Sequence, residues 1–371
     1  MDLPLLLALI AISVPVILHV VTMLKNPRPA NLPPGSLGLP LIGQTLGFLR
    51  AMRSNTAERW IQDRVDRYGS VSKLSLLGTP TVLVTGPAAN KFVFFSSALA
   101  MRQPLSVRRI LGERNLLELG GADHKRIRGA LAEFLKPDML RLYVGKIDGE
   151  VRRHIDERWE GRSTVTVMPL MKRLTFDIIT SLLFGLERGP VRDALAGDFE
   201  RVIEGHDEVA KGKGDGEALL TWEDLGKMKF TWRVAQETLR VVPPIFGNFR
   251  TAIQDVEFGG YTIPKGWQVF WTAGVTHMDA AIFPEPHKFD PSRFENNQSS
   301  SAPPCSFVAF GGGPRICVGM EFARIETLVT MHHLLRRFRW RLCCKEDTFA
   351  RDPMPTPLHG LPIEIDQRTY S

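Results

Sequence analysis

The chain has 371 residues, of which 44% are hydrophobic and 23% charged, and this balance excludes an intrinsically disordered protein. Its formal net charge is +7, but it contains no zinc-finger spacing, no RNP-type run and no block of basic residues, so we expect no nucleic-acid partner. All four cysteines lie in the last fifth of the chain and Cys343 and Cys344 are adjacent, which excludes a disulfide framework and favours a reducing compartment.

The N-terminal segment is predicted to span a membrane. Residues 3–24 contain no charged side chain, and at ~1.5 Å per helical residue they are long enough to cross a bilayer. Lys25 and Arg28 follow, so the positive-inside rule places the rest of the chain in the cytosol. The alternative is a cleaved signal peptide, but such a peptide begins with basic residues, whereas this chain begins with Asp2. We therefore expect residues 1–25 to be a single-pass transmembrane anchor.

A segment rich in proline and glycine follows the anchor. Residues 26–45 hold five prolines and three glycines, a density that no regular helix or sheet tolerates. We expect a stiff hinge that holds one globular domain, residues 46–371, at the membrane surface.

The globular part shows helical and strand periodicities in alternation. Apolar residues recur every three or four positions, which predicts helices, at residues 55–68, 122–136, 138–159, 168–185, 222–241 and 318–337. Strand-like patterns lie at residues 70–77, 79–85, 256–263 and 267–271, with a Pro-dense irregular stretch at 283–294. The pattern contains no internal repeat, and it predicts a mainly α fold with small β-sheets, in the α+β class.

The segment 307–326, FVAFGGGPRICVGMEFARIE, carries the strongest functional signal. Three consecutive glycines permit a tight backbone path, and Cys317 follows them just before a predicted helix. The free N–H groups and positive dipole end of a helix N-terminus stabilise a thiolate. Gly319 leaves room for a flat macrocycle against the backbone, and Arg315 is placed to bind a carboxylate. The alternative is a buried structural cysteine beside a glycine-rich loop.

Two pairs of polar residues lie on predicted helices. Glu237 and Arg240 are three residues apart, and His124 and Arg128 are four apart, so each pair shares one helix face. A solvated surface ion pair is the alternative for the first, and an exposed basic helix is the alternative for the second.

The Cys317 loop resembles the cysteine-loop signature of the cytochrome P450 family. The matching positions are Phe310, Gly311, Gly313, Arg315, Cys317 and Gly319. Val318 stands where plant members often have proline. The order of the anchor, the hinge, the ExxR helix with its double proline, the FDPSRF segment and the Cys loop is also similar to the family order. LTWEDLGKMKFTW and GGYTIPKGWQV resemble the plant branch that oxidises steroids, diterpenes and triterpenes.

This resemblance implies a haem b whose iron is bound by the thiolate of Cys317. The other residues that it places at the cofactor are Phe310, Gly311 and Gly319 in the loop, and Arg315, Arg128, His124 and Arg250, of which the last four bind the propionates. In the family the Glu237–Arg240 pair is buried and bound to a third residue, here Arg293, and the triad fixes the geometry that supports the Cys loop.

A central part of the family pattern is missing from the sequence. Family members carry a long distal helix with an Ala/Gly-Gly-x-Asp/Glu-Thr motif, whose acid and alcohol deliver protons during oxygen activation. Here about 50 residues separate Gly185 from Glu237, and they contain no such motif. Residues 191–205 resemble the start of one family helix, and residues 206–220 resemble the end of a much later segment. We expect an internal deletion of roughly a hundred residues near Gly205–His206.

No catalytic residue is therefore assigned. The stretch 272–276, TAGVT, resembles the missing motif superficially, but it follows the ExxR helix in a predicted strand-and-loop region, which excludes it as the distal helix. Loss of a central helix would expose core surface and one haem face, so we expect low stability and weak or absent turnover.

The resemblance implies a monooxygenase of the endoplasmic reticulum membrane, with its haem domain on the cytosolic side. It would hydroxylate an apolar terpenoid or steroid-like substrate with O₂ and with electrons from an NADPH-dependent flavoprotein reductase. Basic residues that could dock the reductase are Lys125, Arg126, Arg336 and Arg337. One alternative is a truncated or splice form without turnover. Another is a haem-thiolate isomerase or dehydratase of lipid hydroperoxides, which the regular spacing of the Cys loop disfavours.

Overall fold

The computed structural model describes residues 31–40, 42–76, 78–102, 112, 114–184, 219–295, 302–343, 349–351 and 354–368. The helices are α2 (Thr45–Arg53), α3 (Ala57–Tyr68), α4 (Pro87–Phe95), α6 (Gly121–Phe134), α7 (Pro137–Arg158), α8 (Val167–Phe184), α10 (Trp222–Lys227), α11 (Lys229–Val241), α12 (Ala273–His277) and α13 (Met320–Arg337). The strands are β1 (Val71–Leu76), β2 (Thr79–Val84), β3 (Leu99–Ala100), β4 (Thr164–Thr166), β5 (Gly247–Ala252), β6 (Val256–Phe258), β7 (Tyr261–Ile263), β8 (Gln268–Thr272), β9 (Phe338–Leu342), β10 (Phe349–Arg351), β11 (Pro355–Pro357) and β12 (Pro362–Gln367).

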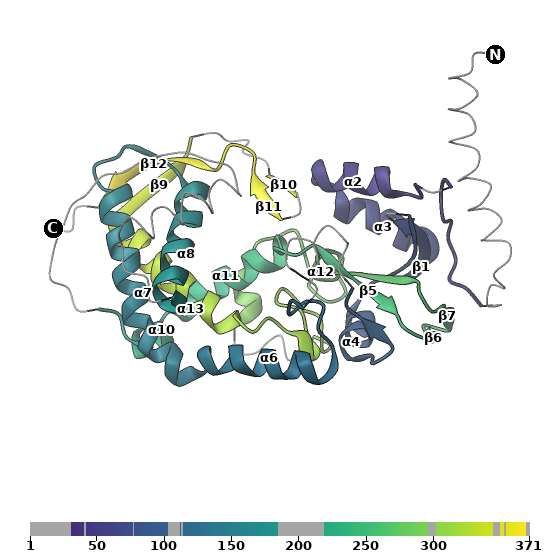
Figure 1. Ribbon diagram of the computed structural model, residues 1–371. Coiled ribbons are helices and arrows are strands. Elements are labelled where there is room, and N and C mark those ends of the chain that lie inside the picture. Colours follow the sequence, from purple (N-terminus) through teal and green to yellow (C-terminus); the bar gives the residue numbers. More distant parts are fainter. Residues whose placement is uncertain are drawn as a thin grey trace, which may run out of the picture.

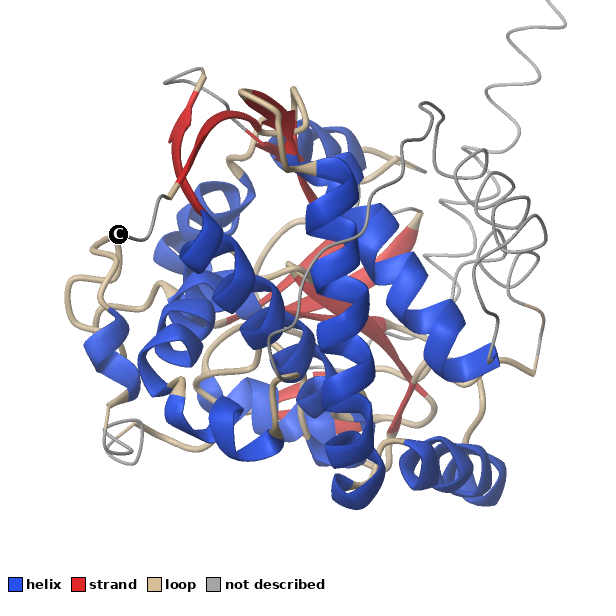
Figure 2. Ribbon diagram, turned by 90° about the vertical axis from the view of Figure 1, so that its left-hand side faces the viewer, coloured by secondary structure: helices blue, strands red, loops and turns tan. Residues whose placement is uncertain are grey.

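The molecule has a helical side and a sheet side (Figure 1). The helical side contains α6, α7, α8, α10, α11 and α13, with the sheet β4-β12-β9 at one end. The sheet side contains the five-stranded sheet β1-β2-β8-β5-β3, together with α2, α3, α4 and α12. Viewed from the helical side, the helices lie in front of the strands of this sheet (Figure 2). The mixed helix and sheet content confirms the predicted α+β class.

The core of the helical side is centred on α7. Its apolar residues step by three and four, and Leu140, Val144, Ile147, Val151 and Ile155 are each at most 1% exposed. They pack against α8 and α13 in one hydrophobic cluster. The predicted helix at 138–159 is therefore confirmed, and the core that it forms fixes the position of α13.

The core of the sheet side depends on a short turn and on distant strand pairing. β1 and β2 pair antiparallel across a turn at Gly78, which adopts a φ of +74°. β2 then pairs in parallel with β8, and β8 pairs antiparallel with β5. α12, which directly follows β8, packs against α3 and α11, and its Thr276 hydroxyl accepts from the side chain of Asn90 on α4 at 3.4 Å.

The described part of the predicted hinge packs against β1. The amide of Lys73 donates to the carbonyl of Pro34 at 2.8 Å, and the amide of Gln44 donates to that of Ser75 at 2.9 Å. A Cβ at Gly43, whose φ is +63°, would collide with the backbone of Ser75, so this close approach requires glycine.

Three local predictions were wrong. The single helix predicted at 222–241 is two helices, because Met228 has a non-helical backbone, and its side chain packs against the helical core. The strand predicted at 256–263 is the hairpin β6–β7, which turns at Gly259 and Gly260 with φ values of +61° and +81°. The 272–276 stretch is the end of β8 followed by α12.

Two predictions lie outside the described residues. They are the apolar segment 3–24 and the junction at 191–218. No helix among the residues that the structure does describe is long and apolar enough to cross a membrane.

Candidate haem-binding site

The Cys317 loop is held against α4 by its glycines. A Cβ at Gly312 would collide with the ring of Phe94, and one at Gly313, whose φ is +62°, would lie 2.7 Å from the carbonyl oxygen of Phe94. The amide of Cys317 donates to the carbonyl of Phe310 at 2.9 Å, which closes the loop. These contacts explain why the sequence has three consecutive glycines there.

The loop presents its cysteine at the start of α13. Gly319 is the N-cap of this helix, and the Cys317 side chain is exposed. A Cβ at Gly319 would lie 3.9 Å from the Sγ of Cys317, and one at Gly311 would meet no atom within 4 Å. The half-buried Phe310 precedes Gly311. An open space therefore lies beside the thiol, at a helix terminus that favours an anionic sulfur.

Four basic side chains form a group beside the loop, which we name the cation cluster: Arg128, Arg250, Arg315 and His124. Burial, and secondarily the charge of Arg315, lowers the pKa of Arg250 to about 10. Burial and the charge of Arg128 lower the pKa of Arg315 in turn. Burial, with the charges of Arg315 and Arg128, lowers the pKa of the buried His124 imidazole. The structure therefore brings these four predicted residues together.

The cation cluster has no anionic partner within the described part of the chain. Arg315 donates to the carbonyls of Leu116, at 3.1 Å, and of Leu119. Arg250 donates to the carbonyl of Phe249 at 3.2 Å. No Asp or Glu among the described residues forms an ion pair with any of the three arginines. A buried arginine and two half-buried ones without anions indicate a site for an anionic ligand, and the two carboxylates of a haem fit this set of donors.

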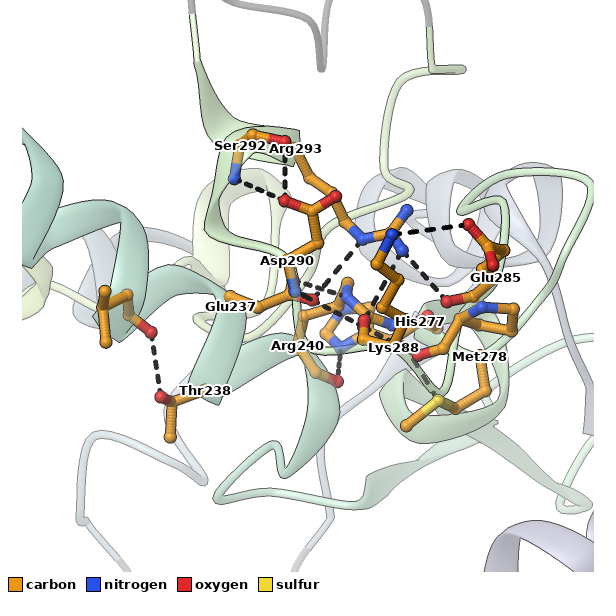
Figure 3. Close-up of polar contacts among 12 residues, drawn as sticks. Glu237, Thr238, Arg240, His277, Met278, Glu285, Lys288, Asp290, Ser292 and Arg293 are labelled. Atoms are coloured by element: carbon orange, nitrogen blue, oxygen red, sulfur yellow. Dashed lines mark hydrogen bonds and ion pairs between the residues drawn. The ribbon is translucent and has the colours of Figure 1, made fainter.

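A second charged group, which we name the ExxR cluster, is formed by Glu237, Arg240 and Arg293 (Figure 3). Both carboxylate oxygens of Glu237 accept from the guanidinium of Arg240, at 2.7 and 2.8 Å, and both side chains are fully buried. Nε of Arg293 lies 3.4 Å from Oε1 of Glu237, which also accepts from the Asp290 amide at 2.9 Å. The predicted triad is thus assembled in the structure, and the alternative of a solvated surface pair does not apply.

Arg240 also binds the end of α12 and the loop that follows this helix. Nη2 of Arg240 donates to the carbonyl of Pro286 at 2.7 Å, and Nη1 donates to the carbonyl of His277 at 2.8 Å. Its guanidinium lies 5.4 Å from the ring centroid of Phe283. Arg240 thus joins α11 to the end of α12 and to the loop that follows it.

One residue of the site, His277, was missed from the sequence. Its fully buried ring contacts Arg240 through Nδ1 and Val308 of the Cys317 loop through Nε2. Both partners are backbone groups, which leave no signature of residue type. The available signal was a histidine at the end of the short segment 273–277 that follows the apolar strand β8.

The basic residues predicted to dock a reductase differ in their surroundings. Lys125 and Arg126 are exposed on α6, and Arg336 is exposed at the end of α13. Arg337 forms ion pairs with Asp156 and, at 3.2 Å, with Glu160, so it joins α13 to the end of α7. Docking by the first three stays a prediction, whereas Arg337 has an internal structural role.

Comparison with known proteins identifies the family. The family model described as cytochrome P450 matches residues 33–213 and 199–364. Beta-amyrin 28-monooxygenase of Medicago truncatula is 33% identical, with 92% of this chain and 94% of that protein covered. Taxane 13-alpha-hydroxylase of Taxus cuspidata is 30% identical, with 93% and 94% covered. The structure of retinoic acid-bound cyanobacterial CYP120A1 superimposes with a TM-score of 0.77 at 26% identity, covering 91% of this chain and 100% of that one.

The same comparisons show the internal shortening. The alignment with the taxane hydroxylase spans 456 positions, which exceeds the 371 residues of this chain by 85. The two segments matched by the family model meet at residues 199–213, which include the predicted junction near 205–206. The chain is therefore an internally shortened member of the cytochrome P450 family of monooxygenases, whose cofactor is a haem with an axial cysteine thiolate.

Proposed function

We propose that Cys317 is the axial ligand of the haem and that the chain hydroxylates an apolar terpenoid or steroid-like substrate. The observation that carries the haem assignment is the cation cluster beside an exposed cysteine, with no described carboxylate to neutralise it. In this proposal Arg128, Arg250 and Arg315 bind the propionates, with His124 beside them. When bound, the haem supplies an iron centre that activates O₂, with electron density donated by the thiolate.

The substrate class is supported by the relatives. Proteins named for hydroxylation of taxanes and for oxidation of beta-amyrin, all about 30% identical, cover more than nine-tenths of the chain. Taxanes and beta-amyrin are apolar polycyclic terpenoids, so binding one requires an apolar cavity. We propose a substrate of this kind, with electrons supplied by an NADPH-dependent flavoprotein reductase. We also propose that residues 1–25 anchor the chain in the endoplasmic reticulum membrane.

A second candidate is a haem-binding chain that has lost turnover. It is favoured by the shortening between Gly185 and Glu237, a stretch that contains no Ala/Gly-Gly-x-Asp/Glu-Thr motif. Proton delivery and substrate enclosure would then be missing, while the residues at Cys317 could still bind the cofactor.

The full chain, expressed with a haem supply, tests both candidates. We expect the reduced, carbon monoxide-bound chain to show the red-shifted band of thiolate-bound haem, and C317S to lack it. Its absence from the unsubstituted chain would overturn the haem assignment.

Incubation with the reductase, NADPH, and either a taxadiene or beta-amyrin then separates the two candidates. Hydroxylated product supports the monooxygenase, whereas a thiolate-type band without product supports the form lacking turnover. Sequencing of transcripts across the codons for Gly205 and His206 would show whether a longer form exists.

A further inference from the structure

His277 lies between the ExxR cluster and the Cys317 loop. Its Nδ1 lies 3.1 Å from the carbonyl oxygen of Arg240, and its Nε2 lies 2.9 Å from the amide nitrogen of Val308. A carbonyl oxygen can only accept and an amide can only donate, so Nδ1 carries the proton and Nε2 is the acceptor. The two bonds thus define one neutral tautomer of the ring.

The connection to the ExxR cluster is reciprocal. The side chain of Arg240 donates to the backbone carbonyl of His277, and the side chain of His277 donates to the backbone carbonyl of Arg240. Glu237 binds the same guanidinium through two oxygens and so fixes the position of Arg240. Arg240 in turn fixes the position of His277.

The connection to the cysteine runs through the loop backbone. The carbonyl of Val308 accepts from the amide of Gly311 at 2.9 Å, and the carbonyl of Phe310 accepts from the amide of Cys317 at 2.9 Å. The ring of Phe307 stacks on the His277 imidazole with centroids 5.3 Å apart. His277 therefore binds the start of the Cys317 loop, at Phe307 and Val308.

We propose that His277 is a positioning residue for the haem ligand, which transmits the fixed geometry of Glu237 and Arg240 to Cys317 through the amide of Val308. The inference rests on the proposed haem-thiolate site. Burial lowers the pKa of His277 to about 3, which keeps the ring in the neutral form that this geometry needs.

Three substitutions in the full chain test the proposal. H277F keeps a ring of similar size and loses both hydrogen bonds. H277Q can place an amide oxygen near the position of Nε2 and so keep an acceptor for Val308. H333F is the matched control, since His333 is also buried and bonded, to Asp148 at 2.5 Å, but lies in the last third of α13, away from the loop.

The first readout is the fraction of bound haem that gives the thiolate-type band after reduction and addition of carbon monoxide. We expect H277F to lose this fraction roughly tenfold or more, because a buried donor at the base of the loop is left unpaired. H277Q should recover a large part of it, and H333F should keep it even where its unfolding midpoint falls. Retention of the unsubstituted fraction by H277F, or an equal loss in H333F, would overturn the proposal.

The second readout is hydrogen exchange of the Val308 amide in the haem-free chain, which does not depend on cofactor binding. We expect exchange in H277F to be at least roughly tenfold faster than in the unsubstituted chain, with the Leu328 amide in α13 as the internal reference. Unchanged exchange at Val308 would contradict the connection itself. Faster exchange in a chain that never gives a thiolate-type band would instead place the failure in the proposed haem function.

Discussion

The cation cluster and the ExxR cluster differ in how their charges are compensated. In the ExxR cluster, Glu237 lies fully buried between Arg240 and Arg293, and its oxygens accept from both side chain and backbone. In the cation cluster, burial and the charges of neighbouring arginines lower the pKa values of Arg250, Arg315 and His124, and no described carboxylate neutralises the arginines.

The ExxR cluster therefore stabilises the local structure, whereas the cation cluster is suited to bind an anionic ligand. A buried ion pair with satisfied hydrogen bonds fixes geometry by itself. A buried cation such as Arg250, with like charges and no anion beside it, disfavours the folded haem-free chain and becomes favourable when an anion binds. Loss of a charge from the ExxR cluster should therefore lower the unfolding free energy of the haem-free chain, whereas loss of a charge from the cation cluster should not.

Removal of the charge of Glu237 should cause the largest loss of stability. E237Q leaves the buried Arg240 and the largely buried Arg293 without their carboxylate, which should cost about 3–5 kcal/mol of unfolding free energy. Since domains of this kind have only about 5–15 kcal/mol in total, this loss is a large share of the stability, and the urea midpoint should fall clearly. Urea unfolding followed by circular dichroism measures this, and an unchanged midpoint would contradict the role of the ExxR cluster.

Removal of Arg250 from the cation cluster should lower the haem affinity without lowering the stability of the haem-free chain. R250Q should not lower the unfolding free energy of the haem-free chain, because Arg250 is buried beside a like charge and, among the described residues, its side chain donates only to the neighbouring Phe249. Its haem affinity, measured by hemin titration, should fall by roughly 10–100-fold through loss of a charge-assisted hydrogen bond. The exposed K146Q on α7 is the control, which should leave the affinity unchanged. A destabilised apoprotein with normal affinity would assign Arg250 to the fold instead.

Acid should destabilise the chain through protonation of His277, which connects the ExxR cluster to the Cys317 loop. The pKa of His277 is lowered to about 3 by burial, against 6.5 for the free side chain. The unfolded state therefore binds the proton first, so this contribution to stability is complete above pH 6.5 and is lost as the pH falls towards 3. Between pH 7 and 5 the unfolding free energy should fall by about 2 kcal/mol more in the unsubstituted chain than in H277Q, as measured by urea unfolding. Parallel pH profiles would show that His277 is not buried in the neutral form.

The smallest effect should come from an exposed pair with the same spacing as Glu237 and Arg240. Glu133 and Lys136 are also three residues apart and 2.9 Å from each other, but both side chains are largely exposed. E133Q should leave the urea midpoint unchanged within error, because solvent and salt screen a surface pair. A loss comparable with that of E237Q would mean that spacing, and not burial, sets the value of the pair.

Sequence periodicity predicted the elements whose core is local. The apolar stripe of α7 recurs along one helix, so its burial follows from its own residues. The Cys317 loop and the partners in both charged groups were predicted from a family resemblance, because residues far apart in sequence must meet there. β5, β9 and β12 were not predicted, since each is stabilised by a strand that is not the next one along the chain and shows little alternation of its own.

His277 shows a second limit of prediction from sequence. Its partners are backbone groups 37 and 31 residues away, and any residue type could supply them. Only the fold reveals that this ring has both of its nitrogens bound. The break at Met228 has a similar origin, since the packing of its side chain on the core overrides a continuous helical pattern.

The packing of the Cys317 loop against α4 also bears on the order of events during synthesis of the chain. The side chain of Asn90 donates to the carbonyl of Cys305 across 215 residues of sequence, and Arg315 donates to Leu116 across 199. At about 5–20 residues per second, the ribosome needs roughly 10–40 s to make the chain between such partners. During that interval the surface of α4 around Phe94 has no glycine loop to cover it. The Cys317 loop can therefore pack on α4 only near the end of translation, so a haem bound at Cys317 would enter after most of the chain has been made.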